Sequence, residues 1–330
     1  MSAPNEQQAQ PYVYTTLPPP LKWDACFHFR DGDIILVAEG FAFLLHIGIL
    51  ASHSEVIESW FAGPSPTIPP PHHLGWLDGR PLVALRAIDS AHDLREVLLL
   101  ILGIMDLESV TTYSVAAGLR RLAFAYRMTT VADAVYKLLD PTFPATIQEW
   151  DDRPANPVSF DLGKKQAIEA YNLCKFTRDR HLLAATYYCA LLPEADLRKG
   201  TRRLDGTPEE LAAADLQTVL DAKKLLKRLG AQALREAHKV RAVGCSECAR
   251  THCQEAFLSG ILPNDQDARE LARGHIVSRW ADKELDWAER WQTICERCVR
   301  HARGEHLKIR KALWEQFADS VGLPSRRLDG

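Results

Sequence analysis

The chain has 330 residues, which at about 150 residues per domain suggests two domains. Apolar residues make up 46 % and charged residues 25 %, proportions that exclude a globally disordered chain, a collagen and a coiled coil. The net charge of −3 lacks the strong positive charge of a dedicated nucleic-acid binder, so we do not expect nucleic acid as a partner.

The N-terminal residues 1–21 are rich in Gln and Pro and contain no Lys or Arg. We expect them to form a disordered tail, and they carry neither the apolar segment of a secretory signal nor an Arg-rich transit peptide. The longest apolar run, Val97–Met105, is far shorter than the roughly 20 residues of a membrane span. We therefore expect a cytoplasmic or nuclear protein with reduced thiols and no membrane partner.

Residues 22–145 combine short strand patterns with longer helical ones. β-rich apolar runs at 33–38 and 41–45, separated by a turn at Gly40, predict a hairpin, and Leu82–Leu85 predicts a further strand. The five prolines within 63–79 predict a loop. Apolar residues spaced three or four apart predict helices at 46–61, 93–105 and, as a pair, 109–139. The pattern favours an α+β domain, a small sheet covered by helices.

The rest of the chain is helical in pattern. Residues 146–160, with two prolines among charged side chains, predict a linker. Residues 161–330 predict a mostly α-helical C-terminal domain. Within it, Thr207-Pro208 followed by Glu210 is typical of a helix start, and that helix is expected to continue to about Val240.

Five of the eight cysteines lie between Cys245 and Cys298. They form two C-x2-C pairs with one cysteine after the first pair. Two thiolates three residues apart can bind one ion, and two such pairs complete a tetrahedral zinc site. The predicted ligands of a structural zinc site are therefore Cys245, Cys248, Cys295 and Cys298.

Other interpretations of these cysteines remain open. The 46 residues between the two pairs exceed the usual spacing of a compact zinc finger. His252, Cys253 or His301 is a candidate to replace one of the four ligands. Buried thiols that simply pack in a core are the main alternative, and thiol redox chemistry is the third.

Motifs of catalysis and phosphate binding are absent from the sequence. It contains no G-x-S-x-G elbow, phosphate loop, G-x-G-x-x-G fingerprint or H-E-x-x-H pair. We therefore expect that the protein is not an enzyme, and we assign no catalytic or cofactor-binding residue. A deep pocket holding a His or Cys with a perturbed pKa would favour an enzyme instead.

An ordered set of residues runs through the first domain. It comprises Asp33, Ile34, Leu36, Val37, Phe43, His46, Ile49, Leu50, Ala51, Ser54, Phe61, Leu82, Val83, Leu85, Asp89, Asp93, Leu94, Leu102, Gly103, Leu119, Leu122, Ala123, Tyr126, Val131, Leu139, Phe143 and Pro144. Over residues 24–144 this set resembles the BTB/POZ domain. Ile47-Gly48 and Val56-Ile57 depart from the family's pattern, and the proline loop is long.

The second half strengthens this resemblance. Helices, C-x2-C knuckles and a tail running from Ala312-Leu313-Trp314 to Gly322-Leu323-Pro324 are similar to an expanded group of BTB proteins in mushroom-forming fungi. That group implies no reaction. The resemblance implies a protein–protein interaction module that forms homodimers or acts as an adaptor, with a cullin of a ubiquitin ligase as a candidate partner. A BTB-type transcriptional regulator in the nucleus is the alternative, which salt-dependent binding to DNA would favour.

Overall fold

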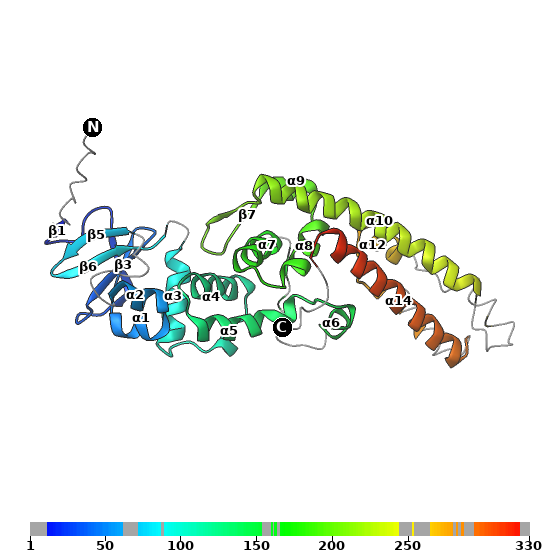
Figure 1. The fold of residues 1–330 in the computed structure, drawn as a ribbon, viewed down its shortest axis with the longest axis horizontal. Coiled ribbons are helices and arrows are strands. Elements are labelled where there is room, and N and C mark those ends of the chain that lie inside the picture. The colour runs from blue at the N-terminus through cyan, green and yellow to red at the C-terminus, as the bar shows by residue number, and fades with distance from the viewer. Residues whose placement is uncertain are drawn as a thin grey trace, which may run out of the picture. The chain divides into compact units, whose positions relative to one another are not determined.

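A computed structural model describes residues 12–61, 72–86, 89–153, 160, 162–163, 166–243, 253, 265–279, 282, 285–286 and 294–323. The chain forms two compact units (Figure 1). Unit 1 comprises Met1–Leu138 with Leu204–Thr207, and unit 2 comprises Leu139–Arg203 with Pro208–Gly330. No helix among the described residues is both long and apolar enough to cross a membrane.

Unit 1 is built on a mixed sheet of six strands in the order β1-β5-β6-β3-β4-β2. The strands are β1 (Val13–Tyr14), β2 (Lys22–His28), β3 (Ile34–Ala38), β4 (Phe41–Leu45), β5 (His72–Leu77) and β6 (Arg80–Ala84). All five residues of β3 are buried, because both faces of the central sheet are covered. On one face, Tyr14, Leu17, Leu21 and Trp23 pack against the strands.

Two tight turns create the hairpins of this sheet. Ala38 pairs with Phe41 across Glu39-Gly40, and Leu77 pairs with Arg80 across Asp78-Gly79. All four turn residues have positive φ, the conformation of the two-residue turn that matches strand twist. The predicted first hairpin is confirmed. The loop predicted over 63–79 is wrong at its C-terminal end, because His72–Leu77 forms β5. The Asp78-Gly79 turn joins this strand to β6.

The helices of unit 1 lie beside the sheet and pack on one another (Figure 1). They are α1 (Ile47–His53), α2 (Glu55–Phe61), α3 (Ala91–Ile101), η1 (Leu107–Ser109), α4 (Tyr113–Ala125) and α5 (Thr129–Leu139). α3 starts where Ser90 Oγ accepts a hydrogen bond from the Asp93 N–H, and it buries Leu94, Val97 and Leu98. The expected segments are helical, although 46–61 forms two helices that are separated at Ser54 and the helix predicted at 93–105 ends at Ile101. A small sheet combined with helices is compatible with the expected α+β class.

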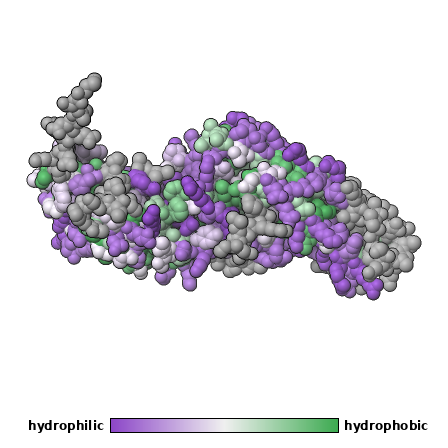
Figure 2. All heavy atoms as spheres, in the orientation of Figure 1, coloured by the Kyte–Doolittle hydropathy of each residue, from purple (hydrophilic) through white to green (hydrophobic). Residues whose placement is uncertain are grey.

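Unit 2 is mostly helical in its described part. Its elements are η2 (Asp140–Thr142), α6 (Ile147–Asp152), α7 (Gln166–Thr177), α8 (Leu182–Leu191), α9 (Glu194–Lys199), β7 (Thr201–Arg202), β8 (Pro208–Glu209), α10 (Ala213–Val243), α12 (Asp265–Arg273) and α14 (Glu296–Ser320). The long helices α10 and α14 lie side by side (Figure 1). Hydrophilic residues predominate on their visible face (Figure 2), so their apolar residues face the interior.

The core of unit 2 joins segments that are far apart in the sequence. Tyr187, Leu226, Leu271 and Phe317 are among its buried residues. α10 passes so close to the end of α12 that a Cβ on Gly230 would lie 1.8 Å from the Leu271 carbonyl oxygen. Glycine stands inside this helix because no side chain fits there.

The boundary between the units differs from the expected linker. The division falls at Leu138/Leu139, and Ile147–Asp152 forms α6, whose Ile147 is buried in the core of unit 2. Trp150 also packs against this core. Apolar side chains among the charges therefore place this segment within unit 2. The tail expected at 1–21 also differs, because Val13–Tyr14 forms β1 and pairs with β5. Within this segment, residues 1–11 lie outside the described range.

The helix start predicted at Thr207-Pro208 is wrong. Pro208–Glu209 instead pairs with β7, and α10 begins at Ala213. Glu209 is drawn into tertiary contacts, since Arg203 Nε donates to its Oε1 at 2.5 Å and Asn172 Nδ2 to its Oε2 at 2.5 Å. These half-buried partners satisfy the buried Glu209 carboxylate within the strand pair.

Candidate metal centre

Three cysteines from two distant segments meet at the start of α14. The Sγ atoms of Cys253, Cys295 and Cys298 all lie within 4.8 Å of one another. Cys253 and Cys298 are buried, and Cys295 is half-buried. The structure thus brings together two of the four predicted zinc ligands and the candidate substitute Cys253. The other two predicted ligands, Cys245 and Cys248, lie outside the described residues.

The C-x2-C spacing puts two of these thiols at a helix N-terminus. Cys295 occupies the N-cap position of α14 with an extended backbone, φ −73° and ψ 152°, and Cys298 is the third residue of the helix. The positive end of the helix dipole favours the thiolate over the thiol. The backbone N–H of Cys295 also donates to Cys253 Sγ at 3.5 Å. Both effects stabilise negative charge on the cluster.

Apolar side chains surround the three sulfurs among the described residues. Cys253, Leu285, Ile294, Cys298, Val299 and Ala302 form a hydrophobic cluster in the described part of unit 2, with Cys295 packed against it. Thiolates are soft ligands that select zinc over magnesium or calcium. Of the two candidate substitutes that are histidines, His301 is not part of the cluster, and His252 lies outside the described residues.

A second group with ligand atoms close together is Cys174, Asp179 and His181. His181 is buried, and its Nε2 lies 2.9 Å from Asp140 Oδ1 while its Nδ1 lies 3.6 Å from Asp179 Oδ1. The ring also stacks on Phe143, with centroids 5.0 Å apart. Both ring nitrogens face carboxylates, so this histidine ties η2 to the turn between α7 and α8.

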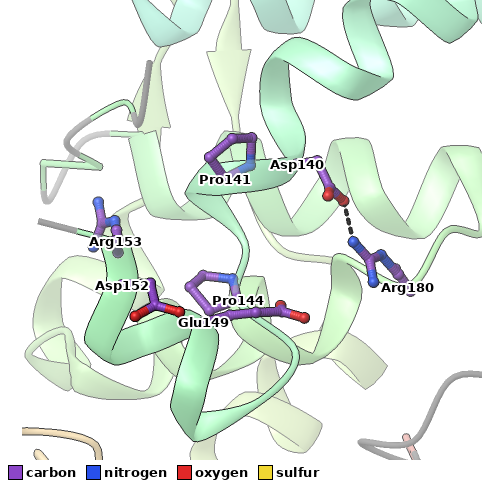
Figure 3. A pocket seen from close by; sticks show the side chains of 7 residues that line it. All are labelled: Asp140, Pro141, Pro144, Glu149, Asp152, Arg153 and Arg180. Atoms are coloured by element: carbon purple, nitrogen blue, oxygen red, sulfur yellow. Dashed lines mark hydrogen bonds and ion pairs between the residues drawn. The ribbon is translucent and has the colours of Figure 1, made fainter. Parts of the chain in front are cut away.

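A surface pocket of about 300 Å³ lies beside this network (Figure 3). Asp140, Pro141, Pro144, Glu149, Asp152, Arg153 and Arg180 line it. Its charged groups already have partners within unit 2. Glu149 Oε2 accepts from the Ala145 N–H at 2.7 Å, and Arg153 Nη2 donates to the Phe160 carbonyl at 2.8 Å. The charged side chains that line the pocket therefore stabilise the local fold.

Asp140 carries the strongest charge network of that pocket. It forms an ion pair with Arg180 and a hydrogen bond with His181. Burial raises the pKa of Asp140, but the hydrogen bonds from His181 and Arg180 outweigh it and bring the pKa to about 2. The carboxylate therefore stays ionised well below neutral pH, which suits a structural anchor rather than a proton donor.

Lys223, a basic residue of α10, has a structural role. Lys223 Nζ donates to the carbonyl oxygens of Ala190 at 3.0 Å and Leu192 at 2.6 Å. These carbonyls end α8, where a cation is favoured by the helix dipole. Burial, followed by repulsion from Lys227, lowers the pKa of Lys223.

The buried imidazole of His306 on α14 makes stability depend on pH. Burial, with a smaller effect of the Arg310 cation, lowers the pKa of His306 to about 4, and Glu305 opposes this shift. Between pH 6.5 and 4 the unfolded chain therefore binds a proton that the folded chain does not. The contribution is complete above pH 6.5 and is lost as the pH falls, by about 2 kcal/mol near pH 5.

Urea denaturation at neutral pH and near pH 5 measures this effect. We expect His306→Gln to lose less stability than the wild type on acidification, and we expect His53→Gln, a half-buried control in unit 1, to behave like the wild type. An equal loss in His306→Gln and wild type would contradict the assignment.

Comparisons with known proteins add no relative. No protein-family model matches the chain, and no curated protein is significantly similar to it.

Cys253 was predicted only as a substitute ligand. Cys253 lies five residues after Cys248, outside the C-x2-C pattern. This spacing alone does not show whether Cys253, Cys245 or Cys248 lies close to Cys295 and Cys298. The His252-Cys253 pair was the available signal. Only the fold shows which sulfur faces Cys295 and Cys298.

Proposed function

We propose that the protein is a non-catalytic adaptor in which unit 1 is a BTB-type interaction domain and unit 2 holds a second protein. The observation that carries this proposal is the order of elements in unit 1. A β3–β4 hairpin leads into α1 and α2, a further strand pair follows, and α3, α4 and α5 complete the unit. The BTB/POZ pattern implies the same order of hairpin, helices, strand and helical hairpin.

Several residues of the BTB/POZ pattern make hydrogen bonds between elements of unit 1. Asp33 Oδ1 accepts from the Ile47 N–H at 2.6 Å and so links the first hairpin to α1. Ser54 Oγ accepts from the Ile57 N–H at 3.1 Å and donates to the Tyr126 carbonyl at 2.6 Å. Contacts of this kind join the sheet, α2 and the end of α4, which supports a shared architecture.

Unit 1 also exposes apolar side chains that suit a protein partner. Ile104 is 67 % exposed, and Phe61 and Phe124 are 40 % and 38 % exposed. Proteins use exposed apolar side chains at interfaces. The protein then acts by bringing two other molecules close together. Unit 1 binds a second copy or a cullin, and unit 2 binds another protein, in the cytoplasm or the nucleus.

Two measurements on the full chain test this proposal. Light scattering reports the mass of the purified protein, where a dimer has twice the chain's 37.0 kDa. Mass spectrometry of the tagged protein isolated from its native cells reports a cullin in stoichiometric amount. We expect at least one of these complexes, and we expect Ile104→Glu to weaken it while Phe176→Glu, an exposed control in unit 2, leaves it intact.

A monomer that isolates without a cullin would overturn the adaptor proposal. Salt-dependent binding of the same preparation to DNA would point to the transcriptional regulator instead.

A further inference from the structure

We propose that Cys253, Cys295 and Cys298 bind one zinc ion as thiolates and thereby hold the start of α14 against the segment of Cys253. The observation behind this proposal is the convergence of three sulfurs within 4.8 Å, although Cys253 and Cys295 are 42 positions apart in the sequence. The site goes beyond the proposed adaptor function, because zinc binding in unit 2 is independent of which partner unit 1 binds.

The spacing of the sulfurs is compatible with three of the four ligand positions of a tetrahedral zinc site. With Zn–S bonds of about 2.3 Å, two sulfurs of a regular tetrahedron lie about 3.8 Å apart. The cluster's limit of 4.8 Å is compatible with that separation after small side-chain rotations. Three cysteines that only filled a core would not need to point their sulfurs at one another.

The electrostatics of the cluster also favour thiolates. Cys295 and Cys298 stand at the positive end of the 25-residue helix α14. The N–H of Cys295 donates to Cys253 Sγ, and donation of this kind stabilises a sulfur that carries negative charge. The cation would neutralise most of the charge that remains in this apolar environment.

Zinc would have a structural role at this site. Leu285, Ile294, Val299 and Ala302 are buried apolar partners of the cysteines among the described residues. Zinc bound by thiolates contributes its binding energy to folding. The metal would therefore hold Cys253 at the start of α14.

Metal analysis of the full-length protein, purified in reductant without chelator, tests the site. We expect about one zinc per chain in the wild type, as a structural site requires. The informative variant is Cys253→Ser, because a site made only from the two C-x2-C pairs would leave Cys253 outside. We expect Cys253→Ser and Cys298→Ser to lose zinc, and Cys26→Ser, a control at an exposed cysteine, to retain it.

Cobalt binding to the wild type provides a readout that does not depend on how well the variants fold. Cobalt in place of zinc should show the absorption of tetrahedral thiolate coordination, and chelator should lower the melting temperature of the wild type. A wild type without zinc, iron in its place, or a Cys253→Ser variant that keeps its zinc would each overturn the proposal.

Discussion

Replacing Arg121 by methionine is expected to destabilise unit 1 by about 3–5 kcal/mol, because the change leaves a buried carboxylate without its cation. Arg121 Nη1 lies 2.6 Å from Asp93 Oδ2, and the two side chains are only 7 % and 4 % exposed. The pair joins α3 to α4, and α4 comes so close that a Cβ on Gly118 would lie 2.3 Å from Asp93 Oδ1. Urea denaturation of the full chain measures the loss.

Two further variants separate the buried charge from the loss of a long side chain. The double variant Asp93→Leu/Arg121→Met should be less destabilised than Arg121→Met, since no unpaired charge stays buried. Arg198→Met makes the same change at an exposed ion pair with Glu194 and should cost less than about 0.5 kcal/mol. Equal losses in the Arg121 and Arg198 variants would show that burial does not strengthen the Asp93 pair.

Replacing Trp314 by alanine is expected to destabilise unit 2 by about 4 kcal/mol, because it opens a large cavity and removes a hydrogen bond. Trp314 is 1 % exposed, and its Nε1 donates to the Ala145 carbonyl oxygen at 2.7 Å. Its ring meets those of Trp150, Tyr187 and Phe317 at centroid distances of 5.6 to 5.8 Å. Scanning calorimetry should show a lower melting temperature for the transition of unit 2.

Two controls assign this loss to packing. Trp314→Phe keeps most of the ring volume but leaves the Ala145 carbonyl without its donor, so we expect a smaller loss than for alanine. Phe176→Ala removes an aromatic ring that is 39 % exposed on α7 and should have a much smaller effect. A loss below about 1 kcal/mol in Trp314→Ala would contradict the central place of this side chain.

The Leu313-Trp314 part of the C-terminal tail lies in the core of unit 2. Leu313 and Trp314 are both 1 % exposed in the core of unit 2. The motif around them therefore has a packing role, and it needs no ligand to account for it.

Elements with a strong local pattern were predicted from the sequence alone. The β3–β4 hairpin and the paired helices α4 and α5 follow from apolar periodicity and turn residues, which act between neighbours in the chain. Strand β5 was not predicted, because the five prolines before it favoured a loop. The Asp78-Gly79 dipeptide, which is typical of a hairpin turn, was the signal for this strand.

Elements whose state depends on distant partners were not predicted. Thr207-Pro208 followed by Glu210 fits a helix start, yet Pro208–Glu209 forms a strand pair in which Asn172 and Arg203 bind Glu209. Segment 147–152 reads as a charged linker, yet its Ile147 and Trp150 pack in a core with side chains from α8, α10 and α14. Burial against distant residues overrides local preference, because it removes much more apolar surface from water.

For the candidate metal centre, the sequence by itself determined the chemistry: several cysteines in C-x2-C spacing, which suit a thiolate site for zinc. It also placed Cys295 and Cys298 within one turn of chain, close enough to bind one ion. Only the tertiary structure decided that Cys253 joins them, through a contact across 42 residues. Spacing constrains thiols within one turn of chain, whereas the meeting of distant thiols depends on how the segments between them pack.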